Sequence, residues 1–107
     1  MRSNKMTLPA DCIVQEDKVK RHKELCTQLH DIYEQKNTAY GDSFGKSFAE
    51  WGISAAAVRI TDKFNRFINL AKHPEINKGD ESLMDTCLDC ANYFIMTAME
   101  LENDGNN

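Results

Sequence analysis

The sequence lacks the features that mark membrane proteins, secreted proteins and proteins that bind duplex nucleic acid. Its 107 residues contain no run of about 18 apolar side chains, so no segment is expected to span a membrane. Lysine and arginine (13) are outnumbered by aspartate and glutamate (17), and the net charge of −4 argues against a phosphate-neutralising surface for a duplex. The first residues do not form a secretory leader, so we expect a cytoplasmic protein with reduced thiols.

Proline is scarce too, with 2 residues, and no strand-like alternation, internal repeat or low-complexity segment occurs. Apolar residues instead recur at steps of three and four, which predicts long helices over residues 14–38, 53–72 and 80–102 and a short one over 46–51. Asp80 is the expected N-cap of the last helix. The fold class is therefore all-α, a helical bundle of three long helices and a short one.

Residues 1–13 lack periodicity and are expected to form an irregular N-terminal arm, followed by a single helical domain over 14–102 and a polar tail over 103–107. The apolar share of 41% allows only a modest core in a chain of this length. We therefore expect the bundle to be completed by homo-oligomerisation.

The four cysteines include Cys87 and Cys90, whose C-x-x-C spacing is found in zinc and redox sites. The pair lies inside a helical pattern, and the sequence has no second such motif to complete a zinc site. We interpret these thiols as small buried core residues.

In the last predicted helix, the spacing predicts a core side made of Met84, Cys87, Leu88, Ala91, Ile95 and Ala98. A polar row runs beside it, made of Glu81, Asp85, Asp89 and Asn92. In the helix before it, the predicted core side is Ile60, Phe64, Phe67 and Ala71, and the polar row is Arg59, Asp62, Lys63, Arg66 and Asn69.

These two rows have two interpretations. They pair with each other or face solvent as ordinary charged flanks. Alternatively, they line a polar cleft in which Glu81, Asp85 and Asp89 hold Mg²⁺ through carboxylate oxygens. In that cleft, Arg59, Lys63 and Arg66 hold phosphate oxygens. Carboxylate-held metal and nearby cations are what phosphoanhydride chemistry requires.

The stretch YGDSFG, residues 40–45, concentrates turn and aromatic residues between two helices. Gly41 permits a left-handed exit from the first helix. The rings of Tyr40, Phe44, Phe48 and Trp51 either stack on a base at the mouth of the cleft or cap the bundle core. Further candidate ligand contacts are Asp42, Ser43 and Tyr93.

Three segments, KNTAYGDSFGKSF (36–48), VRITDKFNRFINL (58–70) and DESLMDTCLDCANYFIM (80–96), together resemble the phage and bacterial family called nucleotide modification associated domain 1. The resemblance covers residues 29–99. That family is similar to the all-α MazG-like nucleotide pyrophosphohydrolases, which form oligomeric helical bundles. Their early E-E-x-x-E pattern is not reproduced by Glu24, Asp31 and Glu34, and the later E-x-x-D pattern is matched only approximately by Glu81, Asp85 and Asp89.

The resemblance implies a phage-type protein of the host cytoplasm that acts on a free nucleotide, with Mg²⁺-dependent phosphoanhydride hydrolysis if it is catalytic. The incomplete acidic pattern makes nucleotide binding the firmer expectation. A non-catalytic sponge that sequesters a nucleotide signal of host defence is the alternative, and a structural bundle without a ligand is a third hypothesis.

Overall fold

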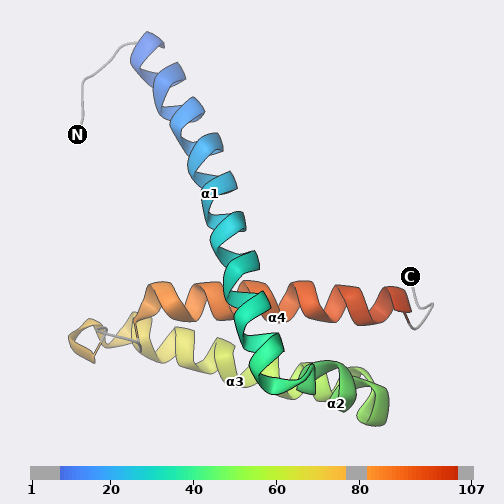
Figure 1. Ribbon diagram of the computed structural model, residues 1–107. Coiled ribbons are helices and arrows are strands. Elements are labelled where there is room, and N and C mark those ends of the chain that lie inside the picture. The colour runs from blue at the N-terminus through green and yellow to red at the C-terminus, as the bar shows by residue number, and fades with distance from the viewer. Residues whose placement is uncertain (1–7, 77–81, 104–107) are drawn as a thin grey trace. The chain divides into compact units, whose positions relative to one another are not determined.

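The structure is a computed structural model that describes residues 8–76 and 82–103, with side chains described over residues 15–75 and 82–103. It is all-α, and the described residues contain no strand. The elements are α1 (Leu8–Tyr40), α2 (Ser43–Trp51), α3 (Ile53–Lys72), the short 3₁₀ helix η1 (Pro74–Ile76) and α4 (Leu83–Asn103) (Figure 1). None of the helices in these ranges is both long enough and apolar enough to cross a membrane.

The predicted helix order is confirmed, with three long helices and one short one. The predicted arm over residues 1–13 is wrong for its second half, because α1 begins at Leu8. Pro9 lies in the first turn of this helix, where a missing N–H has no intrahelical partner to lose, so it does not prevent helix formation.

The chain divides into two compact units, with the boundary inside α1 between Glu34 and Gln35. In the first unit, the described side chains of α1 are mostly exposed, and Val19 has 72% of its surface accessible. Side chains in this part of the helix contact their neighbours one turn away. An example is the Arg21–Glu24 ion pair, with 3.2 Å between Nη1 and Oε1. The prediction of a single domain over residues 14–102 stays a prediction.

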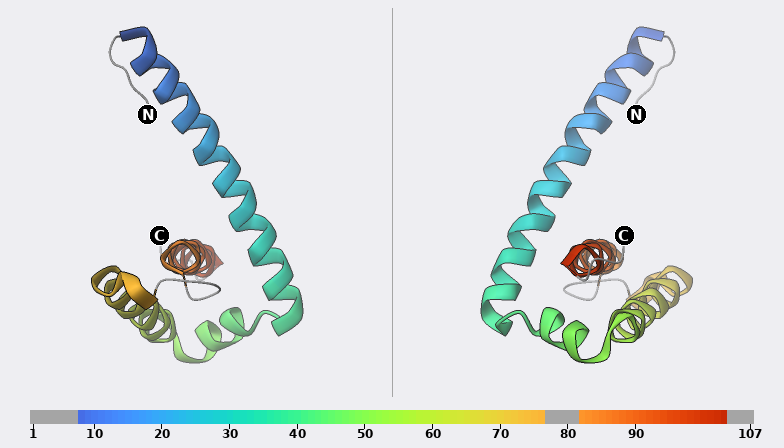
Figure 2. Two further views of the ribbon diagram at one scale, coloured as in Figure 1. Left: turned by 90° about the vertical axis from the view of Figure 1, so that its left-hand side faces the viewer. Right: turned by 90° about the vertical axis from the view of Figure 1, so that its right-hand side faces the viewer.

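In the second unit, α3 and α4 lie side by side and run in opposite directions, and α2 packs against both (Figure 2). The buried core is small and lies where α2 meets α3, with Phe44, Phe48 and Ala56 at its centre. Half-buried side chains surround it: Ile60, Tyr93, Met96 and Leu101. No large side chain among the described residues is completely buried.

The predicted core side of α4 is wrong for four of its six residues. Met84 and Ile95 have 47% and 49% of their surface exposed, Cys87 and Ala98 are also exposed, and only Leu88 is buried and Ala91 half-buried. The buried positions of α4 are instead largely polar: Thr86, Asn92 and Thr97. The two threonines fit there because each hydroxyl donates to a carbonyl one turn earlier, Thr86 to Ser82 at 3.0 Å and Thr97 to Tyr93 at 2.7 Å.

The predicted core side of α3 is half right. Ile60 and Phe67 are half-buried, whereas Phe64 has 56% of its surface exposed and Ala71 is exposed. The side of α3 that packs inward is rotated toward Ala56, Arg59, Lys63 and Leu70. Both helices therefore turn part of their apolar surface outward and part of their polar surface toward each other.

Candidate functional site

The turn between α1 and α2 contains two consecutive left-handed residues, Gly41 with φ of 60° and Asp42 with φ of 56°. Asp42 is the N-cap of α2, and its carboxylate accepts a hydrogen bond from the Gly45 N–H at 3.3 Å. Ser43 is the exposed first residue of α2. Both residues were predicted to contact a ligand, and the structure gives Asp42 a capping contact.

Phe44, another predicted ligand contact, is a core residue with 6% of its surface exposed. Its ring lies 5.8 Å from that of Tyr93 at an interplanar angle of 44°, and Phe48 is buried beside it. For these two phenylalanines, the structure shows the core alternative. Tyr40, at the end of α1, keeps 68% of its surface exposed.

Arg59 connects this aromatic core to the surface. Its Nη2 donates to Ser47 Oγ at 3.2 Å, and its guanidinium carbon lies 5.7 Å from the centre of the Phe44 ring. A hydroxyl and an aromatic face hold the guanidinium in place without neutralising its charge. Arg59 is therefore a positioned cation.

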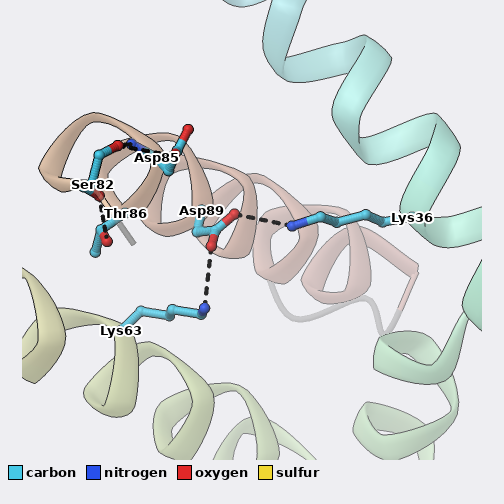
Figure 3. A network of polar contacts seen from close by, with 6 residues as sticks. All are labelled: Lys36, Lys63, Ser82, Asp85, Thr86 and Asp89. Atoms are coloured by element: carbon cyan, nitrogen blue, oxygen red, sulfur yellow. Dashed lines mark hydrogen bonds and ion pairs between the residues drawn. The ribbon is translucent and has the colours of Figure 1, made fainter. Parts of the chain in front are cut away.

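Asp89 in α4 accepts hydrogen bonds from two lysines. Lys63 of α3 lies 3.1 Å from Oδ2, and Lys36 of α1 lies 3.3 Å from Oδ1, so the carboxylate sits between them (Figure 3). Only 24% of the Asp89 side chain is exposed, against 57% for Lys36. Two ammonium groups share one carboxylate, which leaves this cluster with an excess of positive charge.

The predicted polar row of α3 divides into two parts. Arg59, Lys63 and Arg66 are half-buried, and their steps of four and three place them in one line, along which Arg59 contacts α2 and Lys63 contacts α4. Asp62 and Asn69 are exposed. The cations of the row therefore come together on one side of α3, which we call the cationic row (Arg59, Lys63 and Arg66).

Next to the cationic row lies a shallow, open depression between α2 and α3. It has a volume of about 330 Å³, and most of its lining is apolar. The indole of Trp51 and the side chain of Val58 both remain largely exposed, at 66% and 62% of their surface. The residues that line the depression are Ser47, Trp51, Ser54, Ala55, Val58 and Arg59.

Of the predicted magnesium ligands, Asp89 lies between the two lysines and Asp85 belongs to the start of α4. Ser82 Oγ accepts from the Asp85 N–H at 3.0 Å, as an N-cap side chain does, and its hydroxyl donates to Asp85 Oδ2 at 2.8 Å. The N-cap role expected of Asp80 is thus filled by Ser82. Glu81, like Asp80, lies outside the described residues. Within the described ranges, no three His, Cys, Asp or Glu side chains come close enough to hold a metal ion together.

The cysteines were predicted to be buried core residues, and this is wrong for two of them. Cys26 and Cys87 are exposed, Cys90 is half-buried, and all three are free thiols. Burial raises the pKa of the Cys90 thiol, and the neighbouring Cys87 and Asp89 raise it further, against a smaller lowering effect of Lys63.

The sequence pattern placed Lys63 and Asp89 in two polar rows on neighbouring helices, and the two side chains form an ion pair in the structure. Asn92, predicted as a member of the polar row, is buried, and Tyr93, predicted to lie near Asp89, is half-buried. The contact of Lys36 was not predicted. This lysine lies near the end of a long exposed helix, and nothing in the sequence except its charge marks it. Ser47 and Val58 were also not predicted as lining residues.

The comparisons with known proteins found no significant match to a family model, a curated protein or a solved structure. The resemblance to the nucleotide modification associated family therefore stays a prediction.

Proposed function

We propose that this protein binds a free nucleotide and holds it without hydrolysing it. The observation that carries the proposal is the half-buried cationic row beside an apolar depression. The two features share Arg59, which both belongs to the row and lines the depression. A nucleotide combines a flat apolar base with a string of anionic oxygens, so it matches both.

The phosphates are assigned to Arg59 and Arg66, with Lys63 and Lys36 adding to the local positive potential. A guanidinium presents paired N–H groups to phosphate oxygens, and Arg59 is already oriented by Ser47 and Phe44. A small anion needs only two or three such cations, so the net charge of −4 for the whole chain does not oppose this binding.

The base is assigned to the depression. Trp51 offers an exposed aromatic face and Val58 an exposed aliphatic one, and stacking on an aromatic side chain contributes about 1–3 kcal/mol per base. The hydroxyls of Ser47 and Ser54 line the same hollow and supply polar contacts at its edge.

Binding is favoured over hydrolysis by the contacts of Asp85 and Asp89, the two predicted magnesium ligands that lie within the described residues. Mg²⁺ binds through oxygen ligands, whereas Asp89 is engaged by two ammonium groups and Asp85 by Ser82 and its own helix N-terminus. Metal-dependent hydrolysis, the alternative function, requires Asp89 to exchange both lysines for the ion. A sponge for a nucleotide signal, the alternative considered from the sequence, is consistent with the proposal.

The test is to incubate the full chain with mono-, di- and triphosphate and cyclic nucleotides, with and without Mg²⁺. We expect one class to raise the melting temperature, since a ligand at 100 times its Kd adds about 2.7 kcal/mol of stability. After heat denaturation, that ligand should be recovered intact by chromatography. Recovery of a hydrolysed product only with Mg²⁺ establishes the enzyme instead.

A matched pair of variants locates the site. Arg59→Gln removes a cation of the row and should abolish most of the thermal shift. Lys72→Gln removes a cation from an exposed position at the end of the same helix and should leave the shift unchanged. Equal effects of both changes, or no shift with any nucleotide, would contradict the proposal.

A further inference from the structure

Helix α4 is oriented with its apolar side away from the rest of its unit. At about 100° per residue, Met84, Ala91, Ile95 and Ala98 project to one side of the helix, opposite Asp89, Tyr93 and Met96. The structure turns the side with Asp89 and Tyr93 toward α3 and α2, where they contact Lys63 and Phe44. The opposite side, which we call the outward face of α4, is exposed except at Ala91, which is half-buried.

The outward face consists of Met84, Cys87, Ala91, Phe94, Ile95 and Ala98. Phe94 exposes 61% of its surface, Ile95 49% and Met84 47%. All of α4 lies within the described residues, and the charged residues among positions 84–99, Asp85 and Asp89, both project away from this face. A continuous uncharged stripe of four turns is typical of a helix that packs against another apolar surface.

We propose that a second copy of this chain covers the outward face, with α4 crossing its counterpart antiparallel about a two-fold axis at Ala91. In that pairing, residue 84 faces residue 98 of the other copy, and residue 87 faces residue 95. Met84 then meets Ala98, and Ile95 meets Cys87, so these two large side chains each face a small one. This large-to-small complementarity lets two identical faces interlock.

Ala91 on the axis keeps the two helices close, since a small residue at the crossing point permits a short interaxial distance. The outward face also carries no charged side chain. Two such faces can pack together without removing a charge from water, which keeps the desolvation cost low. Both features are internal to the sequence of α4, and they make the face complementary to itself.

The small core is a second, independent argument for a copy of the same chain. Only five hydrophobic residues are buried among those described, Phe44, Phe48, Ala56, Leu70 and Leu88, and none of the large ones completely. A domain of this size gains needed burial by association. A second copy is the one partner present wherever the chain folds.

The test is analytical ultracentrifugation of the full chain and of three variants that each introduce one glutamate. The wild type should sediment as a dimer. Ala91→Glu places two carboxylates against each other on the axis and should raise the dimer dissociation constant by about 100-fold or more. Ala49→Glu, at an exposed position of α2, and Ala57→Glu, on the exposed apolar side of α3, should leave the dimer intact.

A second measurement does not depend on the stability of the monomer. Ala91→Cys should form an intermolecular disulfide under mild oxidation, because the two-fold axis brings position 91 of each copy together. Peptide mass analysis should show that the link joins the two substituted positions. A wild-type monomer, a dimer dissociated by Ala57→Glu but not by Ala91→Glu, or a failure of position 91 to cross-link would overturn the proposal.

Discussion

The carboxylate of Asp42 lies directly above Gly45, so closely that a side chain on Gly45 would collide with both of its oxygens. Gly45 is a buried residue inside α2, where glycine is normally a weak choice. The capping geometry explains the glycine, because the Asp42 carboxylate must reach the Gly45 N–H. In the YGDSFG stretch, Asp42 and Gly45 thus form the N-terminal capping motif of α2.

Gly45→Ala should therefore destabilise the protein by about 1 kcal/mol, through displacement of the cap. At an unconstrained helical position, the same change stabilises by up to about 1 kcal/mol. Urea unfolding monitored by circular dichroism measures the difference. In an Asp42→Gly background, which removes the carboxylate and tolerates the positive φ, the sign should reverse to stabilising. Destabilisation of equal size in both backgrounds would show that Gly45 is needed for another reason.

The Cys90 thiol provides a prediction about pH. Because its pKa is raised in the folded protein, its alkylation rate should rise with pH at a higher midpoint in the native chain than in the urea-unfolded chain. By linkage, the neutral thiol contributes stability below the pKa of the unfolded thiol, and this contribution is lost as pH rises through the folded pKa. Iodoacetamide labelling read by fragment mass spectrometry distinguishes Cys90 from Cys87. Coincident native and unfolded midpoints would contradict the prediction.

A comparison of two equally exposed aromatic residues tests whether a base binds in the depression or nonspecifically on exposed aromatic rings. Trp51 lines the depression, whereas Tyr40 does not. Their exposed fractions are 66% and 68%. Trp51→Ala should weaken nucleotide affinity by about 1–3 kcal/mol, and Tyr40→Ala should change it little. Isothermal titration with the nucleotide identified by thermal shift gives both values. A larger effect at Tyr40 would move the base to the turn before α2, as the sequence alone also allowed.

The sequence was sufficient to predict where the helices stop. Gly41 and Pro74 gave the ends of α1 and α3, and the bounds of α3 agree with the prediction at both residues. The orientation of α4 was not predictable in the same way. A periodic apolar stripe indicates that some surface covers it, but the described residues of the second unit leave the outward face of α4 largely exposed.

The polar rows show a similar limit. Their spacing correctly indicated that cations of α3 and carboxylates of α4 share neighbouring faces, and Lys63 pairs with Asp89 as the first interpretation expected. Spacing within a helix carries no information about a third element. Lys36 comes from α1, and together with Lys63 it makes Asp89, a predicted metal ligand, the shared partner of two ammonium groups.

Asp89 is therefore the residue at which binding and hydrolysis make opposite predictions. If the protein holds a nucleotide through its cations, Asp89→Asn removes a negative charge beside the phosphates and frees Lys36 and Lys63. A unit charge near 4 Å in water is worth about 1 kcal/mol, so affinity should rise about 5-fold. If Asp89 is a magnesium ligand, the same change should abolish turnover and weaken Mg²⁺-dependent binding.

The Asp89→Asn measurement needs two accompanying controls. Asp31→Asn makes the same change in net charge at an exposed position of the first unit, and it should leave the affinity unchanged. Titrations at two salt concentrations show whether the gain is electrostatic, since screening should reduce it at the higher one. The loss of a partly exposed ion pair costs at most about 1 kcal/mol of folding stability, so the variant stays folded and the two mechanisms can be compared in it directly.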